Sequence, residues 1–324
     1  MRRLLPAAVL LALLAASPAP AASALAPKFL LKAKALKEEV RLGESIPLEL
    51  ALHSASAKAV AVAPLELGSP AGLVFYVKTG TGATYQVSKL RGKYSGAEFK
   101  GDVLPLTQLK GGAKMEGKAD LLAILPGKLE ITAVFLGVNR AVQPEPLEAK
   151  PVTVTVLPGK DGETRVGARI RTVKGNMTVA LEPTKAYNTV HNFLTLARDG
   201  YFTKRTFHRI MKDFMIQGGC PRGDGSGDPG WFLPAEFNDI RHEKGVISMA
   251  RRGDHVNTAG CQFFVMHGTA KQLDGNYTAF GRLVEGTEVL DALANVPVQR
   301  SSDPTPSDPV IDPSLDGVDL VLLK

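Results

Sequence analysis

The sequence has few cysteines, no long apolar run and no block of like charges. Its 2 cysteines in 324 residues exclude a small fold held together by several disulfides. After Ala16 no stretch of about twenty apolar residues occurs, so no membrane-spanning helix is expected. The net charge of +7 is spread along the chain without a lysine- or arginine-rich segment. A mildly basic, solvated surface is therefore expected, and nucleic-acid binding is not.

The first residues have the pattern of an export signal. Arg2 and Arg3 precede an apolar run, Leu4 to Ala16, which is too short to cross a bilayer. Ala22-Ser23-Ala24 then fits a cleavage site of small residues. No cysteine directly follows the run, which argues against a lipid anchor. We therefore predict that residues 1–24 are removed and that the mature protein is soluble outside the cytoplasm.

Residues 28–157 have the pattern of a β-rich domain. Short apolar and β-branched runs are separated by Gly, Pro and Ser, and several runs alternate apolar with polar residues. About seven short strands in about 130 residues are typical of an immunoglobulin-like β-sandwich. The predicted strands are 46–50, 60–62, 73–77, 84–87, 129–135 and 152–157.

A polar stretch at residues 158–164 is the predicted linker to a second domain at 165–324. This second half is also mainly β, with two candidate helices, one from Pro183 to Asp199-Gly200 and one from about 286 to 294. A largely antiparallel set of strands with two helices predicts a closed β-barrel with helices capping its ends. The predicted strands are 166–172, 176–181, 207–219, 245–250, 261–267 and 318–323.

Two segments of the second half carry the candidate site. FHRIMKDFMIQGG at 207–219 and GVISMARRGDHVNTAGCQFFV at 245–265 bring together one cation, several large apolar side chains and two amides. This set contains no nucleophile, metal-ligand cluster or acid–base pair. It suits an apolar pocket with a fixed cation, and a reaction in which no bond to a heavy atom breaks. The residues are Arg209, Phe214, Met215, Gln217, Gln262 and Phe264.

Other interpretations of single residues stay open at this point. Taken alone, Arg209 fits a surface ion pair, and the apolar side chains fit a hydrophobic core. Cys220 and Cys261 flank the two segments, and both a disulfide and two free thiols are compatible with the sequence. The histidines have no spacing typical of zinc ligands. The loop at 224–228 begins like a calcium loop but lacks the glycine and glutamate that such a loop needs.

The segment from about Arg165 to Leu323 resembles the cyclophilin family of peptidyl-prolyl cis–trans isomerases, especially its bacterial members. The resemblance covers about half of the chain and does not extend to residues 28–157. Its motifs follow one another with the spacings of the family. They are Asn192-Phe193, Gly200-Tyr201-Phe202, FHRI at 207–210, FMIQGG at 214–219, SMA at 248–250, NTAGCQFF at 257–264 and LDG…FG at 273–281.

The resemblance implies a role for each matching position. The catalytic residues would be Arg209, with Gln217 holding its guanidinium, and Gln262, which with main-chain groups near Arg251 would bond the substrate carbonyl. Gln272 and Tyr277 stand where many relatives have tryptophan and histidine, which puts cyclosporin-type binding in doubt. The substrate-binding residues would be Phe214, Met215, Ala250, Arg251, Phe264, Leu273 and Tyr277.

The sequence therefore predicts a bacterial folding catalyst that is exported to the periplasm or secreted. Its substrates would be proline-containing polypeptides, and it would need no cofactor and no metal. We expect a monomer without nucleic-acid or membrane partners. The alternative is a module that binds proline-containing peptides with little turnover, in which the first domain serves adhesion or docking.

Overall fold

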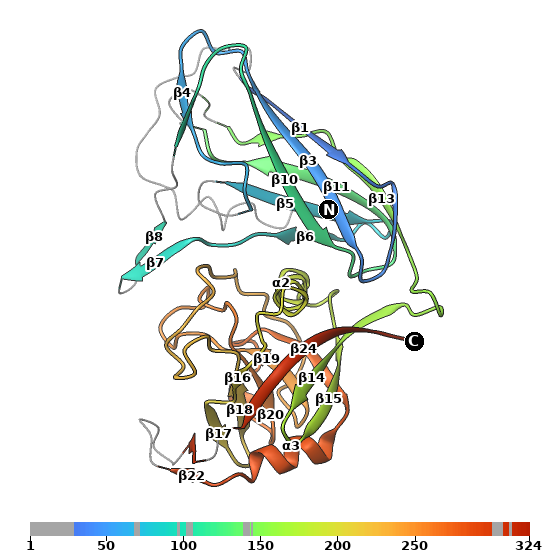
Figure 1. The fold of residues 1–324 in the computed structure, drawn as a ribbon, viewed down its shortest axis with the longest axis vertical. Coiled ribbons are helices and arrows are strands. Elements are labelled where there is room, and N and C mark those ends of the chain that lie inside the picture. Colours follow the sequence, from blue (N-terminus) through green and yellow to red (C-terminus); the bar gives the residue numbers. More distant parts are fainter. Residues whose placement is uncertain are drawn as a thin grey trace.

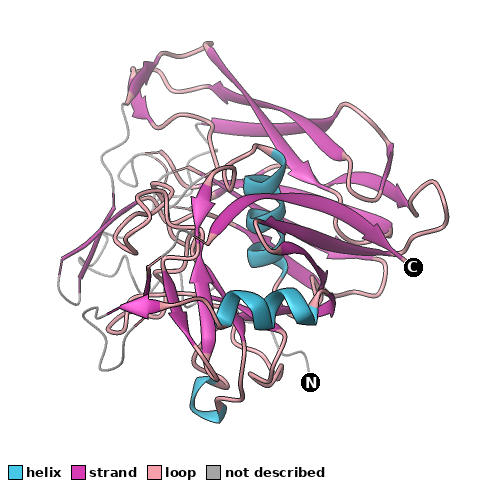
Figure 2. Cartoon of the chain, turned by 60° about the horizontal axis from the view of Figure 1, so that its bottom comes forward, coloured by secondary structure: helices cyan, strands magenta, loops and turns pink. Residues whose placement is uncertain are grey.

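The computed structural model of the chain describes residues 29–324 except 68–71, 96–97, 102–105, 139–142, 144, 300–306 and 311–312. Strands dominate both halves (Figure 2). The predicted export signal at 1–24 lies outside the described residues. Within the described residues, no helix is long and apolar enough to cross a membrane.

Two sheets form the first half of the chain. One has the order β1-β3-β10, and the other has the order β2-β13-β11-β5-β6, with β12 paired to β11. Apolar side chains at alternate positions of these strands, such as Leu48, Leu50 and Leu52, are buried in one core. The bounds are Phe29–Ala35 for β1, Glu39–Arg41 for β2, Ser45–Ser54 for β3, Leu73–Thr79 for β5, Thr84–Val87 for β6, Lys114–Leu122 for β10, Gly127–Phe135 for β11, Leu147–Glu148 for β12 and Val152–Leu157 for β13.

Two short strand pairs complete this half. β4 (Val60–Val62) pairs with β9 (Thr107–Leu109), and β7 (Gly92–Ser95) pairs with β8 (Glu98–Gly101). The six strands predicted here all exist, but the sequence patterns missed the long strands β1 and β10 and the short strands β2, β7, β8, β9 and β12. In β1 and β10, exposed residues, most of them charged, alternate with more buried ones, because one face of their sheet is exposed.

A single nine-stranded sheet forms the second half, in the order β16-β24-β14-β15-β21-β19-β20-β18-β17. Its end strands β16 and β17 are separated along the chain by only Phe207 and His208. The strand β21 was not predicted. The bounds are Arg165–Thr172 for β14, Gly175–Leu181 for β15, Arg205–Thr206 for β16, Arg209–Met211 for β17, Met215–Gly218 for β18, Val246–Met249 for β19, Phe263–Met266 for β20, Ala279–Glu285 for β21 and Ser314–Leu323 for β24. A two-stranded pair, β22 (Val298–Gln299) with β23 (Asp308–Pro309), lies outside this path.

The helix α2 (Tyr187–Arg198) lies between the two halves, and α3 (Thr287–Ala294) lies at the far end of the second sheet (Figure 1). α2 begins four residues after Pro183, where it was predicted to start, because the backbone first makes a turn to Glu182 O. Its cap residue Ala186 has no side-chain acceptor. The buried carboxylate of Glu236 accepts instead the backbone N–H groups of Asn188 and Thr189, at 2.9 and 2.8 Å.

Polar side chains of α2 bind the first half of the chain. Asn188 accepts the Ser88 N–H at 3.1 Å and donates to the Ser88 carbonyl at 2.9 Å. His191 Nε2 accepts the Leu122 N–H at 2.9 Å. Tyr187 stacks on Tyr85 with ring centroids 4.7 Å apart. The helix is therefore buried on both sides, and one continuous hydrophobic core joins the halves.

This packing predicts a pH-dependent stability that depends on His191. Burial, with Lys89 and Arg198 nearby, lowers the pKa of His191 from 6.5 to about 3. As the pH falls, His191 is protonated near pH 6.5 in the unfolded chain but only near pH 3 in the folded chain. The free energy of unfolding therefore decreases as the pH falls from about 6.5 to about 3. The loss is at most about 1.4 kcal/mol per pH unit.

His191→Gln keeps an acceptor for Leu122 and does not titrate. Urea unfolding at about pH 7 and about pH 4.5 should show a smaller loss of stability in this variant than in the wild type. Burial also lowers the pKa values of His208 and His242. Both residues are present in the wild type and in the variant, so their contributions to the loss of stability cancel when the two proteins are compared. Equal losses in the two proteins would refute the role of His191.

Candidate active site

A short hairpin places the candidate cation. β17 and β18 pair antiparallel, and the turn between them passes through Asp213, which has a left-handed φ of 62°. The Asp213 N–H is held by His267 Nδ1 at 2.8 Å. The sequence had predicted one strand-like run at 207–219. The structure breaks that run at residues 212–214, and the fold-back brings Arg209 opposite Gln217.

Strand register then sets up a row of side chains across the sheet. Arg209 pairs with Gln217, Gln217 with Phe264, and Phe264 with Ser248. Residues directly opposite each other on neighbouring strands share one face. The adjacent row, which includes Ile210 and Ile216, points to the other face and is buried in the main core. The period of two thus separates the site from the core.

A pocket of about 150 Å³ opens on the face that carries Arg209, and we call it the Arg209 pocket. Its floor belongs to a small apolar cluster in which Met215 and Phe264 are only 1% and 4% exposed. The lining residues are nine of the ten predicted ones, namely Arg209, Phe214, Met215, Gln217, Ala250, Arg251, Phe264, Leu273 and Tyr277. The tenth, Gln262, lines a neighbouring pocket.

The walls combine two arginines, Arg209 and Arg251, with aromatic and apolar groups. A guanidinium nitrogen of Arg209 lies 3.8 Å from Met215 Sδ. The Phe264 and Tyr277 rings meet edge to face, with centroids 5.8 Å apart. A partly buried guanidinium beside such a low-dielectric wall interacts more strongly with a developing lone pair than it would in water. The pocket can therefore hold a small apolar ring and present a donor to it.

Gln217 and Gln262 connect this pocket to the loop at 225–227. Gln217 Nε2 donates to Gln262 Oε1 at 3.0 Å. Gln262 Nε2 donates to the carbonyl oxygens of Gly225 and Gly227, both at 2.8 Å. The sequence interpretation had Gln262 donate to a substrate carbonyl, but both hydrogens of its amide nitrogen already have protein acceptors. In this structure Gln262 therefore positions Gln217 and the loop.

Arg251 fixes the rim between two loops. Its Nε donates to the Asn276 carbonyl at 2.9 Å, and one terminal nitrogen donates to the Arg252 carbonyl at 2.8 Å. Its guanidinium carbon also lies 4.6 Å from the centre of the Tyr277 ring. The side chain is thus held in place by main-chain carbonyls of the protein.

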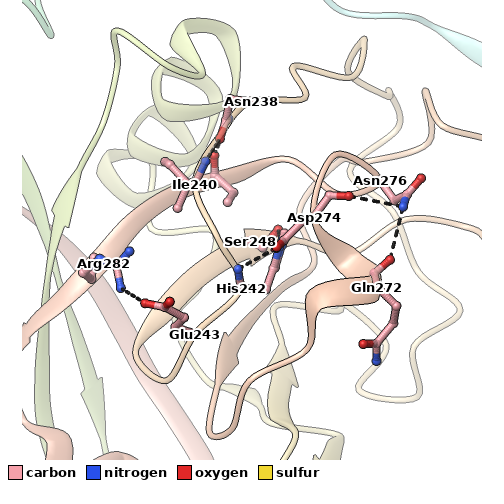
Figure 3. A network of polar contacts seen from close by, with 10 residues as sticks. Asn238, Ile240, His242, Glu243, Ser248, Gln272, Asp274, Asn276 and Arg282 are labelled. Atoms are coloured by element: carbon pink, nitrogen blue, oxygen red, sulfur yellow. Dashed lines mark hydrogen bonds and ion pairs between the residues drawn. The ribbon is translucent and has the colours of Figure 1, made fainter.

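A polar network joins His242 to Asp274 and Ser248 (Figure 3). The buried His242 lies 3.0 Å from Asp274 Oδ1 through Nδ1 and 3.1 Å from Ser248 Oγ through Nε2. Its ring stacks on Phe264, with centroids 6.0 Å apart. Burial lowers the pKa of His242, although Asp274 acts in the opposite direction. The network holds Phe264 and the segment of Leu273, and no motif in the sequence had indicated it.

The two cysteines are free and buried. Cys261 Sγ accepts the Tyr201 hydroxyl at 3.3 Å, and Cys220 Sγ accepts the Gly227 N–H at 3.3 Å. Burial raises the pKa of Cys261 to about 12, which disfavours the nucleophilic thiolate form. In the part of the chain that the structure describes, no group of three or more His, Cys, Asp or Glu residues could hold a metal.

A second pocket of about 230 Å³, the Arg252 pocket, adjoins the first. The two share Gln217, Ala250 and Arg251. Sequence reasoning had not identified Phe232 as part of this surface. The remaining lining residues are Gly225, Ser226, Gly227, Asp228, Phe232, Arg252, Thr258, Gly260, Cys261 and Gln262.

Comparisons with known proteins agree on the second half of the chain. The model of the family "Cyclophilin type peptidyl-prolyl cis-trans isomerase/CLD" matches residues 168–313. A peptidyl-prolyl cis-trans isomerase of Synechococcus elongatus is 43% identical over 130 residues, which are 40% of this chain and 88% of that protein. Peptidyl-prolyl cis-trans isomerase B of Bacillus subtilis is 40% identical over 122 residues, 37% of this chain and 84% of that protein. A solved cyclophilin-type isomerase of Cryptosporidium parvum is 32% identical, covers 49% of this chain and 99% of that one, and has a TM-score of 0.44.

The glutamine bridge predicts the effect of Gln262→Leu. This change removes the partners of one amide nitrogen and two carbonyl oxygens, and an unsatisfied polar group costs about 1–3 kcal/mol when buried. Because the site is partly open to water, we expect the free energy of unfolding, measured by urea denaturation, to fall by about 1 kcal/mol. Gln272→Leu, at an exposed side chain, is the matched control. Equal stability of the two variants would show that the bridge contributes nothing.

Proposed function

The chain belongs to the cyclophilin family of peptidyl-prolyl cis–trans isomerases, and we propose that it isomerises X–Pro bonds of exported proteins in the Arg209 pocket. Peptidyl-prolyl cis–trans isomerisation is the activity of this chain, as it is of the relatives named above. The observation that carries the assignment of the site is the Arg209 guanidinium in a largely apolar pocket lined by nine residues. The roles given to single residues below are part of the proposal.

The reaction needs no proton transfer and no covalent intermediate. Rotation about the X–Pro bond crosses a barrier of about 20 kcal/mol, because amide resonance is lost in the twisted state. The prolyl nitrogen then becomes pyramidal and gains a lone pair. A group that donates a hydrogen bond to this lone pair stabilises the twisted state more than either planar state, and so lowers the barrier.

Arg209 is the group that we assign to this task. A guanidinium carries a positive charge and presents a rigid fork of donors. The cross-strand neighbour of Arg209, Gln217, is itself held by Gln262 and limits the space in which Arg209 can move. The charge is thereby preorganised before the substrate binds, which is the condition for electrostatic catalysis.

The apolar residues of the pocket would hold the pyrrolidine ring. Met215 and Phe264 form the buried floor, and Tyr277 packs against Phe264 from the side. With the ring held, the carbonyl that precedes the proline rotates against it. We assign main-chain groups at Ala250 and Arg251 to this carbonyl, because they line the pocket while the Arg251 side chain is engaged by other carbonyls.

The proposal includes the architecture and the location of the protein. We propose an immunoglobulin-like sandwich at 28–157, a linker at 158–164, and a closed barrel at 165–324. The separate sheets before Leu157 and after Arg165 support this division. The closeness of β16 and β17 along the chain supports closure. Residues 1–24 would direct a monomer to the periplasm or out of the cell, where slow proline isomerisation limits folding.

Arg209→Ala and Arg209→Lys test the catalytic assignment. Each should lower kcat/KM for a proline tetrapeptide at least about tenfold, equivalent to about 1.4 kcal/mol of transition-state stabilisation. The assay is protease-coupled isomerisation, with thermal melting as the check that the fold is intact. Arg169→Ala, which removes an exposed arginine on β14 away from both pockets, is the control and should retain activity. Wild-type turnover by a folded Arg209 variant would end the assignment.

Export predicts a shortened N-terminus. Expression of the full chain in a bacterial host, followed by fractionation and mass spectrometry, should give a periplasmic or secreted protein that begins after Ala24. A cytoplasmic protein that retains residues 1–24 would contradict this part of the proposal and leave the isomerase assignment intact.

A further inference from the structure

The Arg252 pocket has an excess of positive charge. Two arginines and one aspartate line it. The Arg251 guanidinium donates to backbone carbonyls, which carry no net charge, so its own charge is not cancelled. Asp228 is engaged by the Gly230 N–H at 2.9 Å. The pocket therefore favours an anionic side chain over a cationic one.

Arg252 is the exposed cation of this pocket, and an aromatic ring orients it. Its guanidinium carbon lies 5.6 Å from the centre of the Phe232 ring. Its backbone N–H is fixed by the Thr258 hydroxyl at 2.9 Å. A guanidinium stacked on a ring has fewer accessible orientations than a free one, so it loses less entropy when an anion binds.

The first half of the chain holds the wall that carries this ring. Leu90 and Phe232 form an isolated antiparallel bridge, with the Leu90 N–H donating to Phe232 O at 2.7 Å and the reverse bond at 2.8 Å. The Lys89 ammonium lies 3.6 Å from the centre of the Trp231 ring. The segment before β7 therefore fixes the backbone of 231–232, and through it the place of Arg252.

We propose that Arg252 selects substrates with an acidic side chain two residues before the proline, on a wall that the first half of the chain holds in place. This inference rests on the proposed function. In the proposed mechanism, the carbonyl that precedes the proline faces Ala250 and Arg251, and these two residues line both pockets. The chain before the proline thus runs over the Arg252 pocket. In an extended peptide, residues two positions apart face the same side, so the second residue before the proline points into it.

Three tetrapeptides of sequence Xaa-Ala-Pro-Phe, with Xaa as Glu, Gln or Lys, measure the selection in the full-length protein. The expected order of kcat/KM is Glu, then Gln, then Lys. We expect about a threefold step between Glu and Gln, as for a solvent-exposed charge pair. The step should shrink at about 1 M salt because of screening. Equal rates for all three peptides would overturn this inference alone, whereas no acceleration of any peptide would overturn the proposed function as well.

Substitutions at Arg252 assign the preference to one side chain. Arg252→Gln should bring the Glu-to-Gln ratio close to one, and Arg252→Glu should make the Lys peptide the better substrate. Arg169→Glu changes the net charge as much as Arg252→Glu does, at an exposed position that lines neither pocket, and should keep the wild-type order. A wild-type order in Arg252→Glu would overturn the role of Arg252.

Two further variants test the wall. Leu90→Pro removes the N–H that bonds Phe232, and Phe232→Leu removes the ring under Arg252 while leaving the bridge. In each folded variant the Glu-to-Gln ratio should fall, while the Gln peptide is still isomerised. If Leu90→Pro does not fold, Phe232→Leu alone decides. An unchanged ratio in a folded variant would show that the wall does not position Arg252.

Discussion

The register between β17, β18 and β20 is the constraint on which the site depends. It aligns Arg209, Gln217 and Phe264 on one face of the sheet, while Ile210, Ile216 and Val265 enter the core. A shift of one residue in β17 would bury the guanidinium in the core and expose Ile210. Such a shift would expose apolar area to water and leave a charge buried without a partner, and both changes cost free energy. The observed register is therefore strongly favoured. The placement of the cation is thus a consequence of ordinary strand packing, and the glutamine bridge then refines it.

Short-range patterns explain why much of the fold and the Arg209 pocket could be predicted. The helix α2 was predicted from its periodicity and its glycine stop signal, and the segments 207–219, 245–265 and 273–281 contain the nine predicted site residues that line one pocket. What escaped prediction depends on partners distant in sequence. Glu236 caps α2 from 48 residues away, and His242 reaches Asp274 across 32. The tie between Leu90 and Phe232 joins the two halves of the chain. No local pattern encodes such pairs.

The contact between the two halves differs from a flexible linker arrangement. Asn188 and His191 satisfy backbone groups of Ser88 and Leu122 within a buried interface, where an unpaired group would be costly. Because α2 also packs against the sheet that carries the site, the first half acts as a structural partner of the isomerase half. This gives the first half a physical role next to the substrate surface, although it lies outside the segment matched by the family model.

The central claim is that a proline ring occupies the Arg209 pocket with the guanidinium facing its nitrogen. A crystal structure of the protein with a bound Ala-Pro peptide tests this most directly. We predict that the pyrrolidine ring contacts Met215 and Phe264, and that a guanidinium nitrogen of Arg209 lies within about 3.5 Å of the prolyl nitrogen. A proline bound elsewhere, or an Arg209 side chain directed away from the ring, would contradict the account.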